Sequence, residues 1–441
     1  MSSAAPLAIT RLNTRDSAFE DGLRRYTARQ ADAAIDVEAD VREIIADVRE
    51  RGDAALVEYA ARLDGHAVNS AAELRLRLPP QDFARIAALV APEVAHALEQ
   101  AADRIRRYAE RQTLDDWQFE DDDGAQLGQR VTALESVGIY VPGGKAAYPS
   151  SVLMNAIPAQ VAGVQRIVMM VPTPAADMPR AVVMKAAEIA GVSEIYMLGG
   201  AHAVAALAYG TRTIEPVCKI VGPGNAWVAE AKRQVFGRVG VDMIAGPSEI
   251  LVICDGRTEP RWIACDLFAQ AEHDEQARAM LLCPDAGYLD EVLRCMNELI
   301  GDMPRADIIR DSLRYCGLMI EVGDLDEAVA IANRLAPEHL ELSVERPEEL
   351  LGGVRNAGAV FLGRHTSEVL GDYCAGPNHV LPTGGSARFF SPLGAHDFQK
   401  RTSVVRCTPR SADRLGRVAR SLARAEGLFA HEASARCRMT R

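Results

Sequence analysis

The sequence predicts an α/β fold with two open domains, each built around a parallel β-sheet. From about residue 131 onward, short apolar runs of strand length alternate with helical patterns, which is typical of βαβ units. The alternation comes in two arrays separated by the Gly246-Pro247 break, which indicates two domains. With 441 residues the chain is long enough to give each of them its own core.

The composition is that of a globular protein that binds neither nucleic acid nor a membrane. Its apolar fraction of 48% and charged fraction of 25% are ordinary, and its formal charge of −12 argues against a nucleic-acid-binding face. The sequence has no run of about 18 apolar residues and no signal peptide. None of the nine cysteines forms a C-x-x-C pair, so we expect reduced thiols and a cytoplasmic protein.

The N-terminal third is expected to be mostly helical. Residues 1–34 predict a polar arm with one weak helical pattern through Phe19, Leu23 and Tyr26. Apolar spacing then predicts three helices, at 35–51, 54–63 and 92–111. Residues 74–78 alternate and predict a strand, and the acidic stretch 115–123 predicts a turn.

The two βαβ arrays define the domains. In the first array we expect strands at 166–171, 194–198 and 219–221, with helices at 180–190 and from 201. In the second we expect strands at 249–254, 279–283, 317–322 and 359–362, with helices at 260–273, 288–300 and 325–334. We assign residues 35–136 and 248–393 to a discontinuous first domain and residues 137–247 to a second one. Ligands in such folds bind at the carboxyl ends of the strands.

The final segment, 394–441, is expected to be a tail, and its residues 412–441 are expected to be helical and basic. It has little room for a core of its own. Packing on a partner subunit and packing on its own chain are both open interpretations.

The stretch 336–342 sets a carboxylate beside an imidazole. If Pro337 opens a helical turn, Glu338 and His339 lie in its first turn. The positive end of the helix dipole then favours a neutral His339, which can act as a general base. The alternative is a surface turn that enters a strand.

Three glycine-rich turns follow predicted strands, at 140–145, 198–202 and 221–226. Backbone N–H groups in such turns can approach a phosphate at a helix N-terminus. None of them matches G-x-G-x-x-G or the P-loop pattern. A nucleotide site and ordinary strand-to-helix turns therefore both remain open.

Three pairs of polar residues are further candidates for chemistry: Gln270 with His273, Asp372 with His379, and Glu426 with His431. The first pair shares one face of a helix, the second lies in a Gly/Pro-rich loop, and the third lies in the tail. A polar helix end, a connecting loop and a surface turn are the simpler interpretations of the three.

Taken together, these stretches resemble the histidinol dehydrogenase family from about residue 10 to the C-terminus. The motifs are VGIYVPGG at 137–144, SVLMN at 151–155, VGPGN at 221–225, AGPSE at 245–249, QAEH at 270–273, APEHL at 336–340, GDY at 371–373, NHVLPT at 378–383 and DFQK at 397–400. Each motif alone is weak, but their order and spacing together are specific.

The resemblance implies a four-electron oxidation of L-histidinol to L-histidine through L-histidinaldehyde, the last steps of histidine biosynthesis. It also implies two Rossmann-like domains, two NAD consumed per histidinol, one Zn²⁺ per subunit, and a domain-swapped homodimer with shared active sites. The second domain would be the NAD side, and the tail would reach the partner subunit.

The site residues carried over by the resemblance fall into four groups. The zinc ligands are Gln270, His273, Asp372 and His431 of the partner subunit, all of which also contact substrate. The acid–base pair is Glu338 and His339. His339 contacts substrate, takes the hydroxyl proton and assists hydride loss. Glu338 helps water add to the aldehyde. The remaining substrate contacts are Ser248, His379 and Glu426 of the partner subunit. The NAD contacts are Tyr140, Asn225 and the turn that contains His202.

Two positions depart from the family pattern. His202 stands where the family usually has glutamine, so the hydrogen bonds offered to NAD differ. His365 stands where the family often has an aromatic residue. Two other functions remain open: a related zinc- and NAD-dependent dehydrogenase of another small polar alcohol, and a non-catalytic nucleotide-binding paralogue.

Overall fold

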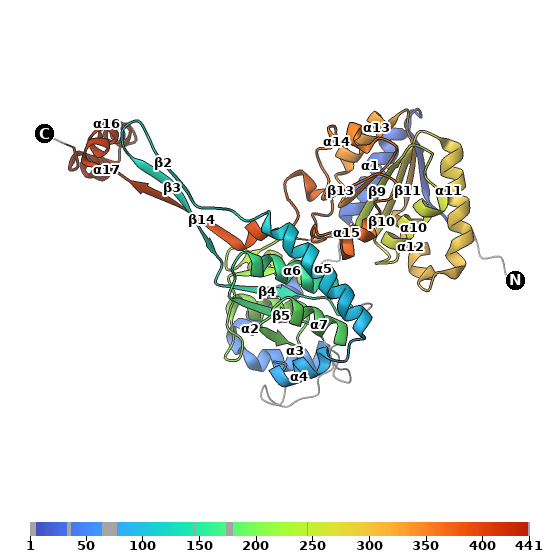
Figure 1. The fold of residues 1–441 in the computed structure, drawn as a ribbon, viewed down its shortest axis with the longest axis horizontal. Coiled ribbons are helices and arrows are strands. Elements are labelled where there is room, and N and C mark those ends of the chain that lie inside the picture. Colours follow the sequence, from blue (N-terminus) through green and yellow to red (C-terminus); the bar gives the residue numbers. More distant parts are fainter. Residues whose placement is uncertain are drawn as a thin grey trace.

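A computed structural model of the chain describes residues 6–32, 37–63, 77–143, 147–172, 180–244 and 246–439. They form two α/β lobes and a long arm that projects from one of them (Figure 1). The predicted α/β class with parallel sheets is confirmed. Within these residues no helix is long and apolar enough to cross a membrane.

The six-stranded lobe is built on a fully parallel sheet in the order β1-β11-β10-β9-β12-β13. Its strands are β1 (Thr10–Asn13), β9 (Glu249–Cys254), β10 (Arg278–Cys283), β11 (Leu318–Glu321), β12 (His339–Ser343) and β13 (Ala359–Leu362). Its helices are α1 (Phe19–Asp32), α10 (Pro260–Ala271), α11 (Ala286–Leu299), α12 (Ala306–Cys316), α13 (Leu325–Leu335), α14 (Pro347–Leu351) and α15 (Glu368–Tyr373). Successive residues of β9 face opposite ways: Ile250 packs with α10–α12 and Leu251 with α1 and α13. Both faces of the sheet are therefore covered, as parallel sheets require.

The five-stranded lobe has a second parallel sheet, in the order β6-β5-β4-β7-β8. Its strands are β4 (Ser136–Tyr140), β5 (Arg166–Met170), β6 (Glu194–Tyr196), β7 (Lys219–Val221) and β8 (Gly240–Val241). Its helices are α2 (Glu38–Arg51), α3 (Asp53–Leu63), α4 (Pro80–Ala87), α5 (Pro92–Glu110), α6 (Pro149–Val161), α7 (Ala181–Ile189), α8 (Gly200–Tyr209) and α9 (Ala226–Val235). Helices α4–α7 cover one face and α2, α3, α8 and α9 the other.

The two sheets share one topology. In each, the first strand of the βαβ array lies centrally, the second and third lie to one side, and the fourth and fifth to the other. The strand order reverses between β4 and β7 in one lobe and between β9 and β12 in the other. In open α/β sheets this reversal opens the crevice where ligands bind.

Two expected boundaries are corrected by the packing. Residues 1–34 are more than an arm, because β1 pairs in parallel with β11 and Phe19, Leu23 and Tyr26 enter the core of the six-stranded lobe. Helices α2–α5 pack with the five-stranded lobe instead of the lobe formed by 248–393: Leu56 of α3, for example, belongs to the core around β5 and α8. Helical spacing shows that a face is buried but not which sheet covers it.

The strand expected at 74–78 is seen only at its end. Residues 74–76 lie outside the described residues, and Arg77 makes an isolated bridge to Tyr196.

The arm is a three-stranded antiparallel ribbon that carries two helices away from the lobes (Figure 1). Its strands β2 (Trp117–Glu120), β3 (Gln126–Ala133) and β14 (Gln399–Arg406) lie in the order β14-β3-β2, and its helices are α16 (Pro409–Ala425) and α17 (Phe429–Arg436). The acidic stretch 115–123, expected as a turn, thus contains a strand. The strand Trp117–Glu120 alternates apolar and polar residues, but it is only four residues long and fully exposed, so it lacks the buried face that a longer alternating run would indicate. Three short 3₁₀ helices complete the description, at Ile300–Asp302, Ser386–Arg388 and Ala395–Phe398.

Candidate active site

His339 is the first residue of β12, not a residue of a helical turn. Helix α13 ends at Leu335 and is capped by Ala336, whose φ of 51° is left-handed, and Pro337 and Glu338 then lead into the strand without forming a helical turn. The helical prediction is therefore wrong here. The alternative, a turn entering a strand, is right about the strand but wrong about the surface, because His339 is only 3% exposed.

Carboxylates surround the buried imidazole of His339. Its Nδ1 lies 3.0 Å from the carbonyl oxygen of Glu249 and can only donate to it, and its Nε2 lies 3.3 Å from Oδ1 of Asp372. Burial alone would lower the pKa of His339, but the carboxylates of Glu368, Glu338 and Asp372 raise it well above its ordinary value. We expected a neutral imidazole at a helix terminus, but the structure shows an imidazole whose charged form is favoured by neighbouring carboxylates.

Glu338 is held by the neighbouring strand. Its Oε2 accepts a hydrogen bond of 2.8 Å from the backbone N–H of Glu249 and lies 3.7 Å from Nδ1 of His339. Burial raises the pKa of Glu338 to about 8. A carboxyl group with such a pKa can carry a proton near neutral pH, as acid–base groups must.

Three of the expected zinc ligands come from two helix ends in the six-stranded lobe. Gln270 is fully buried in the last turn of α10, and His273 follows that helix and is exposed. Asp372 lies in α15, within electrostatic reach of His273 and His339. The structure therefore brings Gln270, His273 and Asp372 to one edge of the sheet.

Glu368 joins this group, although no pattern in the sequence singled it out. When the side-chain amide of Gln270 is oriented so that both its nitrogen and its oxygen have suitable partners, the nitrogen donates to Oε1 of Glu368 at 2.6 Å. His339, Glu368 and Asp372 also offer ligand atoms within 4.8 Å of one another, a grouping that could hold a metal ion. The available signal was the i, i+4 spacing of Glu368 and Asp372 on one face of α15.

His379 ties the site to the other lobe. Its Nδ1 lies 3.0 Å from the carbonyl oxygen of Asp372, and its Nε2 lies 3.2 Å from Oγ of Ser151 in α6. Burial lowers the pKa of His379, which favours the neutral ring. Ser248 lies half-buried at the same edge, just before β9, with its carbonyl bonded to the N–H of Arg278.

The expected NAD contacts lie at the carboxyl edge of the five-stranded sheet. Tyr140 ends β4, and its hydroxyl accepts a hydrogen bond of 3.0 Å from the N–H of Gly200. Asn225 caps α9, with its Oδ1 accepting from the N–H of Val228 at 3.2 Å. In the first glycine-rich turn, residues 144 and 145 lie outside the described residues.

His202 is placed differently from the expectation. Its side chain is fully buried in α8 and stacks on Tyr59 of α3, with ring centroids 5.7 Å apart. The side chain of His202 therefore exposes no surface that a cofactor could contact.

The two lobes present opposite strand ends to the site. Tyr140 and the turn after β7 lie at carboxyl ends, as expected, whereas His339 and Glu249 begin β12 and β9 and lie at amino ends. The expectation of carboxyl ends holds for one sheet and is corrected for the other. Helix α15 contributes to this edge by returning Asp372 to the start of β12.

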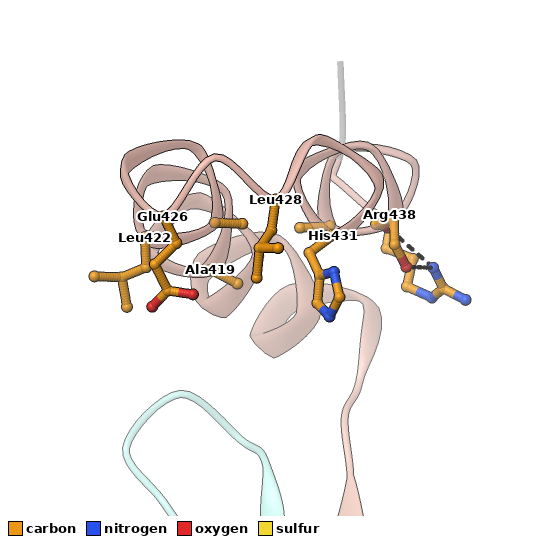
Figure 2. A pocket seen from close by; sticks show the side chains of 9 residues that line it. Ala419, Leu422, Glu426, Leu428, His431 and Arg438 are labelled. Atoms are coloured by element: carbon orange, nitrogen blue, oxygen red, sulfur yellow. Dashed lines mark hydrogen bonds between the residues drawn. The ribbon is translucent and has the colours of Figure 1, made fainter.

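Glu426 and His431 are far from this group within the chain. They line a pocket between α16 and α17 at the tip of the arm, together with Leu422, Leu428 and Arg438 (Figure 2). Both are exposed. One copy of the chain therefore does not bring the two halves of the expected site together (Figure 1).

Comparison with known proteins relates the whole chain to one family. Residues 27–439 match the family model described as histidinol dehydrogenase. A histidinol dehydrogenase of Methylococcus capsulatus is 57% identical over 432 residues, 98% of each chain. One of Pseudomonas syringae pv. syringae is 54% identical over 435 residues, 99% of this chain and 96% of the other. The crystal structure of histidinol dehydrogenase from Elizabethkingia anophelis superposes with a TM-score of 0.92 at 31% identity and covers 99% of both chains.

Proposed function

The chain belongs to the histidinol dehydrogenase family, and from that membership we propose how its residues carry out the reaction. It is an NAD-dependent oxidoreductase that oxidises histidinol to histidine in histidine biosynthesis. The observation that carries the residue assignment is the buried group at the start of β12, where Glu338 and His339 adjoin Asp372.

We propose that the neutral form of His339 removes the hydroxyl proton while a hydride leaves the same carbon for NAD, which gives histidinaldehyde. Its Nδ1 is engaged by the carbonyl of Glu249, so Nε2, which lies 3.3 Å from Oδ1 of Asp372, is the nitrogen left for proton transfer. Glu338, held on the other side of the ring, would in its ionised form take a proton from the water that adds to the aldehyde. His339 would then assist the second hydride loss, which leaves the carboxylate of histidine.

We propose that Gln270, His273 and Asp372 hold one zinc ion with His431 of the partner subunit. Two imidazoles, a carboxylate and an amide oxygen form an N/O donor set that suits zinc. Because the amide nitrogen of Gln270 donates to the carboxylate of Glu368, the amide oxygen of Gln270 points away from Glu368. When bound, zinc supplies positive charge that orients and polarises histidinol, and NAD accepts the hydride.

A second grouping is favoured by its own distances. His339, Glu368 and Asp372 could hold a metal within this chain alone. We prefer the first set because a metal on His339 would occupy the nitrogen that the acid–base role needs.

We propose a domain-swapped homodimer in which the arm completes the partner's site. Glu426 and His431 lie exposed at the tip of the arm, remote from the groups that they would complete. The same tip exposes Leu415, Val418 and Leu422 along α16, an apolar face that a second copy would cover. Ser248, His379 and Glu426 of the partner subunit would then contact histidinol.

We also propose that the enzyme works in the cytoplasm. All nine cysteines are free thiols, which suits a reducing compartment.

The yield of NADH per histidinol tests the assignment. With limiting histidinol and excess NAD we expect about two NADH per substrate, because two hydrides leave in sequence. A yield of one would indicate a simple alcohol dehydrogenase, and no NADH would indicate a binding protein.

A further inference from the structure

An ion pair is buried in the five-stranded lobe, away from the acid–base group. Lys232 on α9 pairs with Asp242, which follows β8, and their side chains are only 3% and 1% exposed. Lysine and aspartate are rarely buried this completely. Removing two charges from water is costly, so we examined which groups the pair contacts.

Both partners bind the same glycine. Nζ of Lys232 donates to the carbonyl oxygen of Gly222 at 3.0 Å, and the N–H of Gly222 donates to Oδ2 of Asp242 at 2.8 Å. The ion pair therefore closes a ring around one residue and holds the peptide groups on both of its sides.

Gly222 occupies a position that only glycine can fill. Its φ is +111°, and a Cβ there would lie 2.2 Å from the carbonyl oxygen of Tyr140. The backbone thus adopts a conformation open to glycine and presses against the end of β4. A clamp that fixes both of its peptide groups keeps it in this conformation.

The clamped residue opens the turn that connects β7 to α9. Three residues later, Asn225 caps α9, and Tyr140 lies on the adjacent strand. This is the crevice where the strand order of the sheet reverses.

Packing of α9 does not depend on the pair. Val228, Ala231 and Val235 already seat the helix in the apolar core. The polar contacts of Lys232 and Asp242 converge on Gly222 instead.

We propose that Lys232 and Asp242 are positioning residues for the dinucleotide: by clamping Gly222 they fix the turn that presents Asn225 to NAD. This inference rests on the proposed function, which places NAD at this edge. The pair touches neither substrate nor the acid–base group, so it acts through the turn alone.

The test replaces both charges, because a single removal would leave an unpaired buried charge. In the full-length, zinc-loaded enzyme, the double variant Lys232→Met/Asp242→Leu is titrated with NADH and, separately, with histidinol. We expect the dissociation constant for NADH and the KM for NAD to rise at least about tenfold, because misplaced binding groups lose that much, while histidinol affinity and zinc content stay unchanged. The double variant Lys232→Gln/Asp242→Asn, which removes both charges but keeps a donor and an acceptor, is the milder change and should shift NADH binding in the same direction by a smaller factor.

Two control variants separate the possible failures. Arg233→Met removes a half-exposed guanidinium that pairs with Glu230 on the same helix and with Glu38, and it should leave NADH binding unchanged. Asn225→Ala reports on the NAD site itself. If Asn225→Ala has no effect on NADH binding, the proposed NAD site is wrong. If Asn225→Ala weakens NADH binding while both double variants bind NADH normally, only the clamp is wrong. Equal losses of NADH and histidinol affinity in the double variant would also overturn it, since they would mark general damage.

Discussion

Nε2 of His339 lies 3.3 Å from Oδ1 of Asp372, so the proposed base and a proposed zinc ligand are in direct contact. Burial would raise the pKa of Asp372, but the hydrogen bond and charge of His339 lower it overall. His339 lies in β12 and Asp372 in α15, so the contact joins this helix to the amino end of β12 in the six-stranded sheet. Substitutions at either residue should therefore affect both proton transfer and metal binding.

Glu338→Gln should separate the two oxidation steps. If Glu338 serves the water that adds to the aldehyde, the variant retains most of the first hydride transfer and loses the second by about 10²-fold or more. Stopped-flow measurement of NADH from histidinol and from histidinaldehyde distinguishes the steps. His339→Asn is the matched control and should slow both; equal losses in Glu338→Gln would contradict the division of roles.

A mixture of two inactive variants should regain activity if the sites are shared. In a heterodimer of His431→Ala and His339→Asn chains, one site carries both defects and the other is intact. Random mixing makes half of the dimers mixed, so about one quarter of wild-type activity is expected. The variants are mixed after reversible dissociation and assayed, with each variant alone as control. No recovery, with mixed dimers demonstrated by mass, would contradict arm exchange.

Zinc content should identify the ligand set. His273→Ala should lose most of the metal, whereas Glu368→Gln, which keeps a side-chain oxygen near Gln270, should retain about one zinc per chain. Metal analysis after dialysis against a weak chelator measures both. Retention in His273→Ala together with loss in Glu368→Gln would instead support the grouping of His339, Glu368 and Asp372.

Glu341→Gln should change how stability depends on pH. Burial raises the pKa of Glu341 to about 8 from its ordinary 4.5, near Asp266 and His339. Between these values the folded protein keeps a proton that the unfolded chain releases, so the contribution of Glu341 to stability falls as pH rises. A neutral amide removes this loss while still accepting from the N–H of Glu368.

Urea unfolding at equal protein concentration measures that effect. Between about pH 5 and pH 8 the free energy of unfolding of the variant should gain about 1–3 kcal/mol relative to wild type. Glu345→Gln, at an exposed position on the same lobe, is the control. Parallel pH profiles for wild type and Glu341→Gln would show that Glu341 ionises normally.

Local patterns in the sequence were enough to locate most of the regular structure. Strands β5, β9 and β10 and helices α2 and α10 lie where they were expected. The period of apolar residues along the sequence shows both the type of element and the face that is buried. The glycine-rich turns and the Glu338-His339 pair were visible in the same way. The family resemblance rested on the order of such motifs, and the comparisons bear it out.

The tertiary structure decided what those elements meet. Helices α2 and α3 pack on the five-stranded sheet, and His339 is surrounded by Glu368, Asp372 and a carbonyl 90 positions away. The clamp on Gly222 likewise joins residues from α9 and from the end of β8. A periodic pattern shows which face of an element is buried but not its partner, and pKa values and contacts depend on the partner. The sequence by itself therefore determined the elements and the family, whereas the edge of each sheet at which the candidate site residues meet was decided only by the folded chain.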